Sequence, residues 1–191
     1  NSQSPVGHTG YGRILFRNYI IGNDADSLVE ARESYSRALS INPENYNANF
    51  DMGLIELYEA DNLMFNNILA GEPYSSGVKQ KSDSAVAYIS RAIRINKNSN
   101  AMYALSLAYE KGGDRGNALE SMLEIYSKKP SDSVLRGKIE DFLVLNEYKA
   151  AHPARVMLSS ENIELSKAAG RESLHKNVIY YLRRAMLLNP L

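Results

Sequence analysis

Cysteine and tryptophan are both absent from this chain of 191 residues. Without cysteine the chain can build neither a disulfide framework nor an iron–sulfur cluster, and it has no thiolate for a zinc site. It also has no excess of one charge, because 22 basic residues balance 22 acidic ones. Nucleic-acid binders and polybasic membrane-surface proteins normally carry a basic surplus, so neither class is expected.

Long apolar runs are missing as well. None approaches the roughly 18–20 residues that cross a bilayer. Strand signals are poor, since no alternating run is bounded by an Asn-Gly or Asp-Gly hairpin. The hydrophobic share of 44% is nevertheless enough for a sizeable core. Amphipathic helical periodicity fills most of the sequence, and it predicts an all-α protein.

The first residue is Asn1 rather than Met. We therefore expect that an upstream part has been removed, such as a signal peptide, an anchor or another domain. Residues 1–10 are rich in small and polar residues, which predicts a flexible lead-in. Residues 11–191 are predicted to form one helical repeat domain. The compartment stays open between cytoplasm and periplasm, with a tether through a missing N-terminal segment as one option.

Four segments repeat one helical pattern: 31–43, 85–97, 118–130 and 178–190. Each opens with a small residue, has a large residue four positions later, and has a further apolar residue three positions after that. This spacing places the three residues on one stripe of a helix. The stripes are Ala31, Tyr35, Ala38; Ala85, Ile89, Ala92; Ala118, Met122, Ile125; and Val178, Leu182, Ala185. Pro43, Pro130 and Pro190 end three of the segments, because proline cannot continue a helix.

This pattern resembles the second helix of the tetratricopeptide repeat, in which small residues stand where two helices touch and a proline ends the unit. The stretch before the third segment resembles the first helix of that family. Leu105, Ser106 and Tyr109 hold its Leu, small and Tyr places, and Gly112–Gly113 supplies the turn. The resemblance implies a right-handed superhelix of antiparallel helix hairpins, a TPR-like α-solenoid.

The resemblance divides the domain into units of about 34 residues, with two departures. The expected units are 12–45, 46–98, 99–132, an irregular 133–158, and 159–191. The second unit, with Met52–Gly53 in the family's Leu–Gly place, is about 20 residues too long. We expect an insertion at 61–81, formed by an extension of the first helix and a loop.

The stretch 133–171 is the least regular. Its periodicity predicts a helix over 133–151, broken at His152–Pro153. Beyond this break, the residues are expected to form either one further helix or a short helix with a fresh start near Ser160.

No grouping typical of catalysis or metal binding stands out. His8, His152 and His175 lie far apart in the sequence, whereas a metal site needs several converging ligands. The glycine-rich stretch 111–117 lacks the spacing of a phosphate loop, and there is no Gly-x-Ser-x-Gly elbow. We expect no enzyme activity, no metal and no cofactor.

In the tetratricopeptide family, the first helices line a concave groove that holds the ligand. Carrying these positions over gives a candidate groove of nine residues. They are Phe16, Ile20, Asn47, Phe50, Leu54, Tyr58, Asn100, Tyr103 and Leu107. The family's clamp for a peptide carboxylate is not expected, because its Lys, Asn and Arg places hold Phe16, Ile20, Asp51, Asn100 and Ala104. The apolar lining suits a partner helix or an extended apolar peptide.

The sequence thus predicts a scaffold that binds a protein or peptide partner, as part of a larger protein or assembly complex. Two alternatives stay open. The groove residues can belong to the core or be covered by the 61–81 insertion. The chain can also assemble with copies of itself, through the groove or through the terminal helix near Tyr180–Leu188. A solenoid that ends on an apolar face leaves that face open, so we expect a further helix, another repeat or a homotypic contact there. An enzyme on a helical scaffold is the least favoured interpretation.

Overall fold

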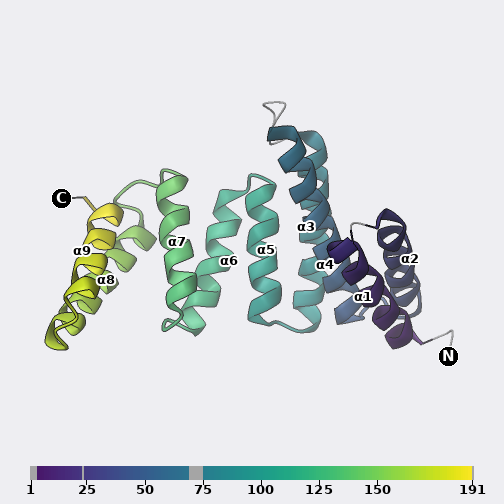
Figure 1. Cartoon of the computed structure of the whole chain (residues 1–191), viewed down its shortest axis with the longest axis horizontal. Coiled ribbons are helices and arrows are strands. Elements are labelled where there is room, and N and C mark those ends of the chain that lie inside the picture. The colour runs from purple at the N-terminus through teal and green to yellow at the C-terminus, as the bar shows by residue number, and fades with distance from the viewer. Residues whose placement is uncertain (1–3, 23, 69–74, 191) are drawn as a thin grey trace. The chain divides into compact units, whose positions relative to one another are not determined.

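The computed structural model describes residues 4–22, 24–68 and 75–190. These residues form nine helices and no strand, which confirms the predicted all-α class (Figure 1). The helices are α1 (Pro5–Gly22), α2 (Ala25–Ile41), α3 (Tyr46–Ile68), α4 (Ser76–Ile95), α5 (Ser99–Lys111), α6 (Arg115–Lys128), α7 (Ser133–Leu145), α8 (Pro153–Arg171) and α9 (His175–Leu188). The chain divides into two compact units, 1–121 and 122–191, and the division falls inside α6.

The first unit is built from helix hairpins. α1 packs along α2, α3 packs along α4, and α5 contacts both α3 and α4. Glycine allows the close approach within each hairpin. A Cβ on Gly12 would lie 2.8 Å from the Tyr35 ring, and one on Gly53 would lie 2.4 Å from Ile89 Cγ1. Tyr35 and Ile89 are both fully buried, so the large residue of each stripe fills the space that the glycine opens.

The predicted stripes are buried in the first three segments but not in the fourth. Ala38, Ala92 and Ile125 are all in the core, as are the large residues before them. In α9, by contrast, Ala185 is buried while Leu182 is 43% exposed. The outer face of α9 therefore carries an apolar side chain that its position in the repeat led us to expect inside.

The flexible lead-in predicted for residues 1–10 is wrong from Pro5 onward, because α1 begins there. Proline suits the first position of a helix, where its missing N–H needs no partner. Thr9 then fixes this end of α1: it is buried, its hydroxyl donates to the Pro5 carbonyl at 2.7 Å, and it accepts from Asn45 Nδ2 at 3.3 Å. Residues 1–3 lie outside the described part of the chain.

The insertion expected at 61–81 is largely helical. α3 continues to Ile68, and α4 already begins at Ser76. Ser75 caps α4 by accepting from the Val78 amide, and Val78 is fully buried, which anchors the early start. The loop was predicted to extend to residue 81, but it ends before Ser76, where α4 begins. Residues 69–74 lie outside the described part of the chain.

The second unit corrects the expected pairing of its helices. α7 ends at Leu145 rather than near 151, and Glu147 just beyond it adopts a positive φ of 55°. Pro153 starts α8 at its first turn, and the helix runs past Ser160 without a break. The unit boundary expected between 158 and 159 therefore falls inside α8. The last hairpin is α8 with α9, and α7 contacts both helices.

Arg155 of α8 closes the far end of α9. Its Nε donates to the Leu188 carbonyl at 2.5 Å and its Nη2 to the Leu187 carbonyl at 2.6 Å. A third donor, Nη1, binds the Tyr148 carbonyl. One guanidinium thus satisfies carbonyls that a helix C-terminus otherwise leaves without partners.

Candidate functional site

The nine predicted groove residues all lie on three helices of the first unit, α1, α3 and α5. α3 contacts both α1 and α5, so the three helices are neighbours although they are not consecutive. Two residues come from α1, four from α3 and three from α5. The structure therefore places the predicted set on adjoining helices, which we call the α1–α3–α5 face.

Aromatic contacts connect α1 and α3 of this face. The ring of Tyr58 meets Phe16 edge-on at 6.4 Å and Tyr19 at 5.5 Å between centroids. Elsewhere on α3, Tyr46 stacks on Phe50 at 5.8 Å. Such pairs stabilise their rings by about 0.5–1.5 kcal/mol beyond the burial of area, so they hold the aromatic part of the face in a fixed arrangement.

Most of the predicted residues divide their surface between core and solvent. The half-buried members are Phe16, Phe50, Leu54, Tyr58, Tyr103 and Leu107. Phe16 packs against the core of the first hairpin, and Phe50, Leu54 and Leu107 pack against the next core cluster. Ile20 is 47% exposed, and both Asn47 and Asn100 are exposed. The face is thus part of the core and still presents apolar surface.

Charged groups beside the face are already paired. Arg13 Nε contacts Asp51 at 2.6 Å, and Arg13 Nη2 donates to Asn47 Oδ1 at 2.9 Å. Burial raises the pKa of the Asp51 carboxyl above its ordinary value, against the opposite pull of Arg13. Lys111 pairs with Asp61. These side chains serve the packing of α1, α3 and α5 and are not arranged to clamp a peptide carboxylate.

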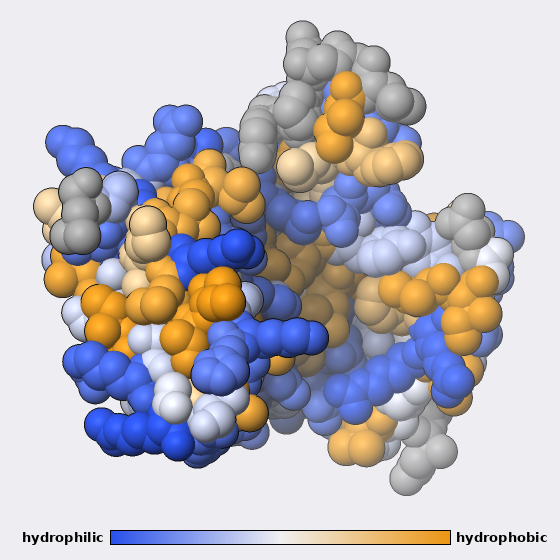
Figure 2. Space-filling model, turned by 60° about the vertical axis from the view of Figure 1, so that its left-hand side comes forward, coloured by the Kyte–Doolittle hydropathy of each residue, from blue (hydrophilic) through white to orange (hydrophobic). Residues whose placement is uncertain are grey.

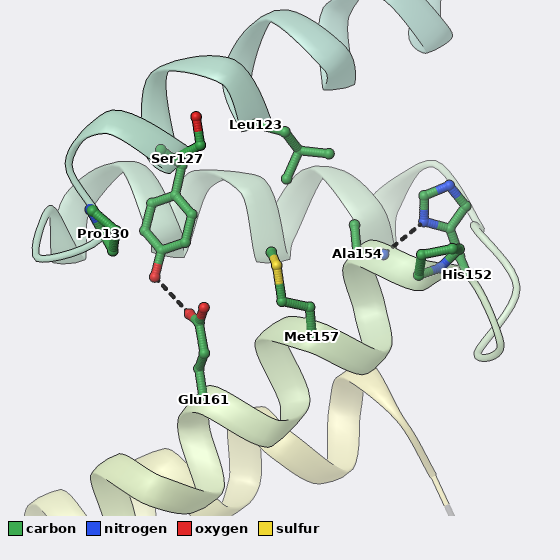
Figure 3. Close-up of a pocket in the computed structure, with 9 residues that line it drawn as sticks. Leu123, Ser127, Pro130, His152, Ala154, Met157 and Glu161 are labelled. Carbon is green, nitrogen blue, oxygen red and sulfur yellow. Dashed lines mark hydrogen bonds between the residues drawn. The ribbon is translucent and has the colours of Figure 1, made fainter.

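A cavity that the sequence did not predict opens in the second unit, between the C-terminal part of α6 and the N-terminal part of α8. Its volume is about 570 Å³, within the range of roughly 300–1,000 Å³ of ligand pockets. The lining is mainly apolar, with α7 passing behind it (Figure 3). The lining residues are Leu123, Tyr126, Ser127, Pro130, His152, Pro153, Ala154, Met157 and Glu161.

Figure 3 shows how the polar groups of this cavity lie. The hydroxyl of Tyr126, on α6, donates a hydrogen bond to Glu161 Oε2 of α8 at 2.6 Å. Burial raises the pKa of Tyr126 to about 12, and the hydrogen bond and charge of Glu161 add to the rise. At the other end, His152 Nδ1 accepts from the Ala154 amide at 3.3 Å, so this ring caps α8.

A second cavity of about 430 Å³ shares Tyr126, Pro130 and Glu161 with the first and continues along α8 to Leu165. We call the two cavities together the α6–α8 groove. Glu164 and Arg136 also line this part. Glu161 makes no ion pair within the described residues, whereas Arg136 pairs with Glu140, at 3.6 Å, and lies over the Tyr181 ring. The groove therefore combines apolar walls with one carboxylate that no described cation pairs with.

No local sequence pattern indicates the α6–α8 groove. Tyr126 and Glu161 are 35 positions apart, and Glu161 stands in the stretch with the weakest periodicity.

Within the described ranges, no three His, Asp or Glu side chains gather in a way that could hold a metal ion. None of the helices described is long and apolar enough to span a membrane. No known family model and no curated protein matches the chain.

Proposed function

We propose that the chain is a protein-interaction module that binds a helix or an apolar peptide segment on the α1–α3–α5 face. One observation carries the proposal. Three helices that are not consecutive in sequence bring half-buried apolar and aromatic side chains onto adjoining positions, and Tyr58 of α3 contacts the rings of Phe16 and Tyr19 on α1. Contiguous apolar surface of this kind typically marks a contact site.

The chemistry of the face favours an apolar ligand segment. Its charged neighbours Arg13, Asp51, Lys111 and Asp61 are engaged with one another, so an acidic or C-terminal motif would find no free cation among them. Aromatic side chains with few rotatable bonds are efficient anchors, because little conformational entropy is lost when they bind. The side-chain amides of Asn47 and Asn100 can hydrogen-bond the backbone of the segment.

We further propose that the hairpins of the first unit are units of a TPR-like, right-handed α-solenoid. The support comes from a repeated local arrangement. In α1–α2 and again in α3–α4, a glycine on the first helix receives the large buried residue of the second, Tyr35 in one case and Ile89 in the other. Small residues on either side of these two, such as Ala38 and Ala92, are fully buried.

The test is selection of binding segments from a displayed library of random peptides, with the purified chain as bait. We expect enrichment of apolar and aromatic sequences, whose affinity is then measured by fluorescence polarisation. Ile20→Asp and Tyr103→Ala should each weaken binding by about tenfold or more, as expected for anchor positions. Val29→Asp is the matched control, because Val29 is exposed on α2, which is not one of the three helices of the face.

Circular dichroism of every variant excludes unfolding as the cause. The proposal is wrong if no sequence class is enriched, or if Val29→Asp weakens binding as much as Ile20→Asp does.

A further inference from the structure

The outer face of α9 is apolar and basic. Ile179, Leu182 and Met186 stand at spacings of three and four residues, which places them on one stripe, and Met186 is 68% exposed. α9 contains no acidic residue. Arg183 and Lys176 adjoin the stripe and make no ion pair within the described residues. In Figure 2, where α8 and α9 come forward, orange side chains lie among blue ones on this surface.

The α6–α8 groove has the complementary properties. Its walls are apolar, through Leu123 and Met157 among others, and Glu161 brings a carboxylate without a cation partner in the described part of the chain. Glu164 adds a second carboxylate, whose exposed pair with Lys167 contributes little stability and is easily exchanged. An apolar stripe flanked by cations fits such a groove better than a neutral or acidic one does.

We infer that α9 of one copy of the chain docks in the α6–α8 groove of a second copy. The dimensions agree. The α8 residues of the groove, Pro153 to Leu165, extend over about 18 Å at 1.5 Å per residue, and the stripe from Ile179 to Met186 extends over about 10 Å. The stripe fits within the groove, where Arg183 can reach the carboxylate of Glu161 or Glu164.

The contact joins two different surfaces, so it is heterologous. A pair of copies keeps one free α9 and one free groove, so association continues head to tail until a ring closes or a chain forms. Pairing α9 with α9 would place Arg183 near another Arg183, and pairing groove with groove would bring carboxylates together. Like charges opposed in this way disfavour both symmetric arrangements.

The experiment measures mass by sedimentation and light scattering from micromolar to millimolar concentration. The wild-type chain should grow in mass with concentration. Leu182→Asp removes the α9 surface, Met157→Asp removes the groove, and each should raise the concentration of half-association by about tenfold or more. Mixing the two variants should restore association but stop it at a one-to-one dimer, because each variant keeps one intact surface.

Ile163→Asp is the matched control, since Ile163 lies on α8 outside the groove with 39% exposure, against 40% for Met157. It should associate like the wild type. A second arm changes charges only and leaves the apolar surfaces intact: Glu161→Lys and Arg183→Glu should each weaken association, and the double variant should recover it. The α1–α3–α5 face is unchanged in all of these variants. A peptide-binding assay on that face therefore tests the proposed function independently of self-association.

A wild-type mass that stays monomeric over the whole range would overturn the inference. So would a mixture of Leu182→Asp and Met157→Asp that stays monomeric, or an Ile163→Asp variant that is as impaired as Met157→Asp.

Discussion

At the scale of single residues, a hydrogen bond between Tyr126 and Glu161 links α6 and α8 within the second unit. The Glu161 carboxylate has no cation partner within the described residues, and it accepts a hydrogen bond from the Tyr126 hydroxyl instead. A tyrosine held in this way resists ionisation, because the phenolate would be buried beside a negative charge.

We predict that Tyr126 titrates near pH 12, because burial and Glu161 raise its pKa to about 12. Since this pKa lies above the ordinary value, the contribution of Tyr126 to stability is complete below about pH 10 and is lost as the pH rises through the folded pKa. The ultraviolet titration of the wild type, minus that of Tyr126→Phe, isolates this group among the 13 tyrosines. Glu161→Gln should lower its pKa. An unchanged titration in that variant would show that the carboxylate does not act on the phenol.

Two glycines with different surroundings give a second prediction. Gly53→Ala should destabilise the chain by about 1–3 kcal/mol, because the new Cβ would overlap Ile89 Cγ1. Gly10→Ala is the control: nothing lies within 4 Å of its Cβ position, and alanine favours a helix over glycine by up to about 1 kcal/mol. Urea denaturation should therefore move the two midpoints in opposite directions. Shifts of the same sign would argue against close packing of α3 on α4.

At the scale of elements, a buried carboxylate on α7 joins three helices. Glu140 accepts from Asn162 of α8 at 2.6 Å and pairs with Arg184 of α9 at 2.5 Å. Its side chain is almost fully buried, whereas the neighbouring Asp141, which pairs with the same Arg184, is exposed. Burial makes the Glu140–Arg184 pair costly to break, whereas water screens the exposed Asp141–Arg184 pair.

We predict that Glu140→Ala destabilises the second unit by about 3 kcal/mol, because Arg184 and Asn162 would lose a buried partner. Asp141→Ala should change the free energy of unfolding by less than about 1 kcal/mol. Hydrogen exchange of amides in α7, α8 and α9 measures both variants. Equal losses of protection would mean that burial does not distinguish the two carboxylates.

The helices that could be predicted from the sequence are those with a regular spacing of apolar residues and a residue such as proline that ends the helix. The stripes around Tyr35 and Ile89 follow the helical spacing, and their burial was foreseen. The composition of residues 1–10 predicted a flexible segment and Pro153 a break, although Pro5 and Pro153 each start a helix. The α6–α8 groove could not be predicted, because it arises where the end of α6 meets α8, and no local pattern encodes that approach.

At the scale of the whole molecule, charge balance is the property that bears most on behaviour in solution. Equal numbers of acidic and basic residues place the isoelectric point near 7.0. Copies of the chain then repel one another least at neutral pH. Specific docking of α9 in the groove and non-specific association both benefit from this, so they have to be separated by experiment.

We predict a solubility minimum near pH 7, where the net charge is zero. Precipitation by polyethylene glycol between pH 5 and pH 9 measures it. The minimum should persist in Leu182→Asp and Met157→Asp, moved slightly toward lower pH by the added charge. Its disappearance in either variant would assign it to the docking contact instead of to net charge.

The guanidinium of Arg155 has a practical consequence for labelling. Because this side chain of α8 holds the last carbonyls of α9, the end of the helix is secured from within the hairpin. A fluorophore or an affinity handle fused after the final residue should therefore leave α9 wound to Leu188. The same attachment in Arg155→Ala should let the last turn fray, so a reporter at this terminus can also read out the integrity of the α8–α9 hairpin.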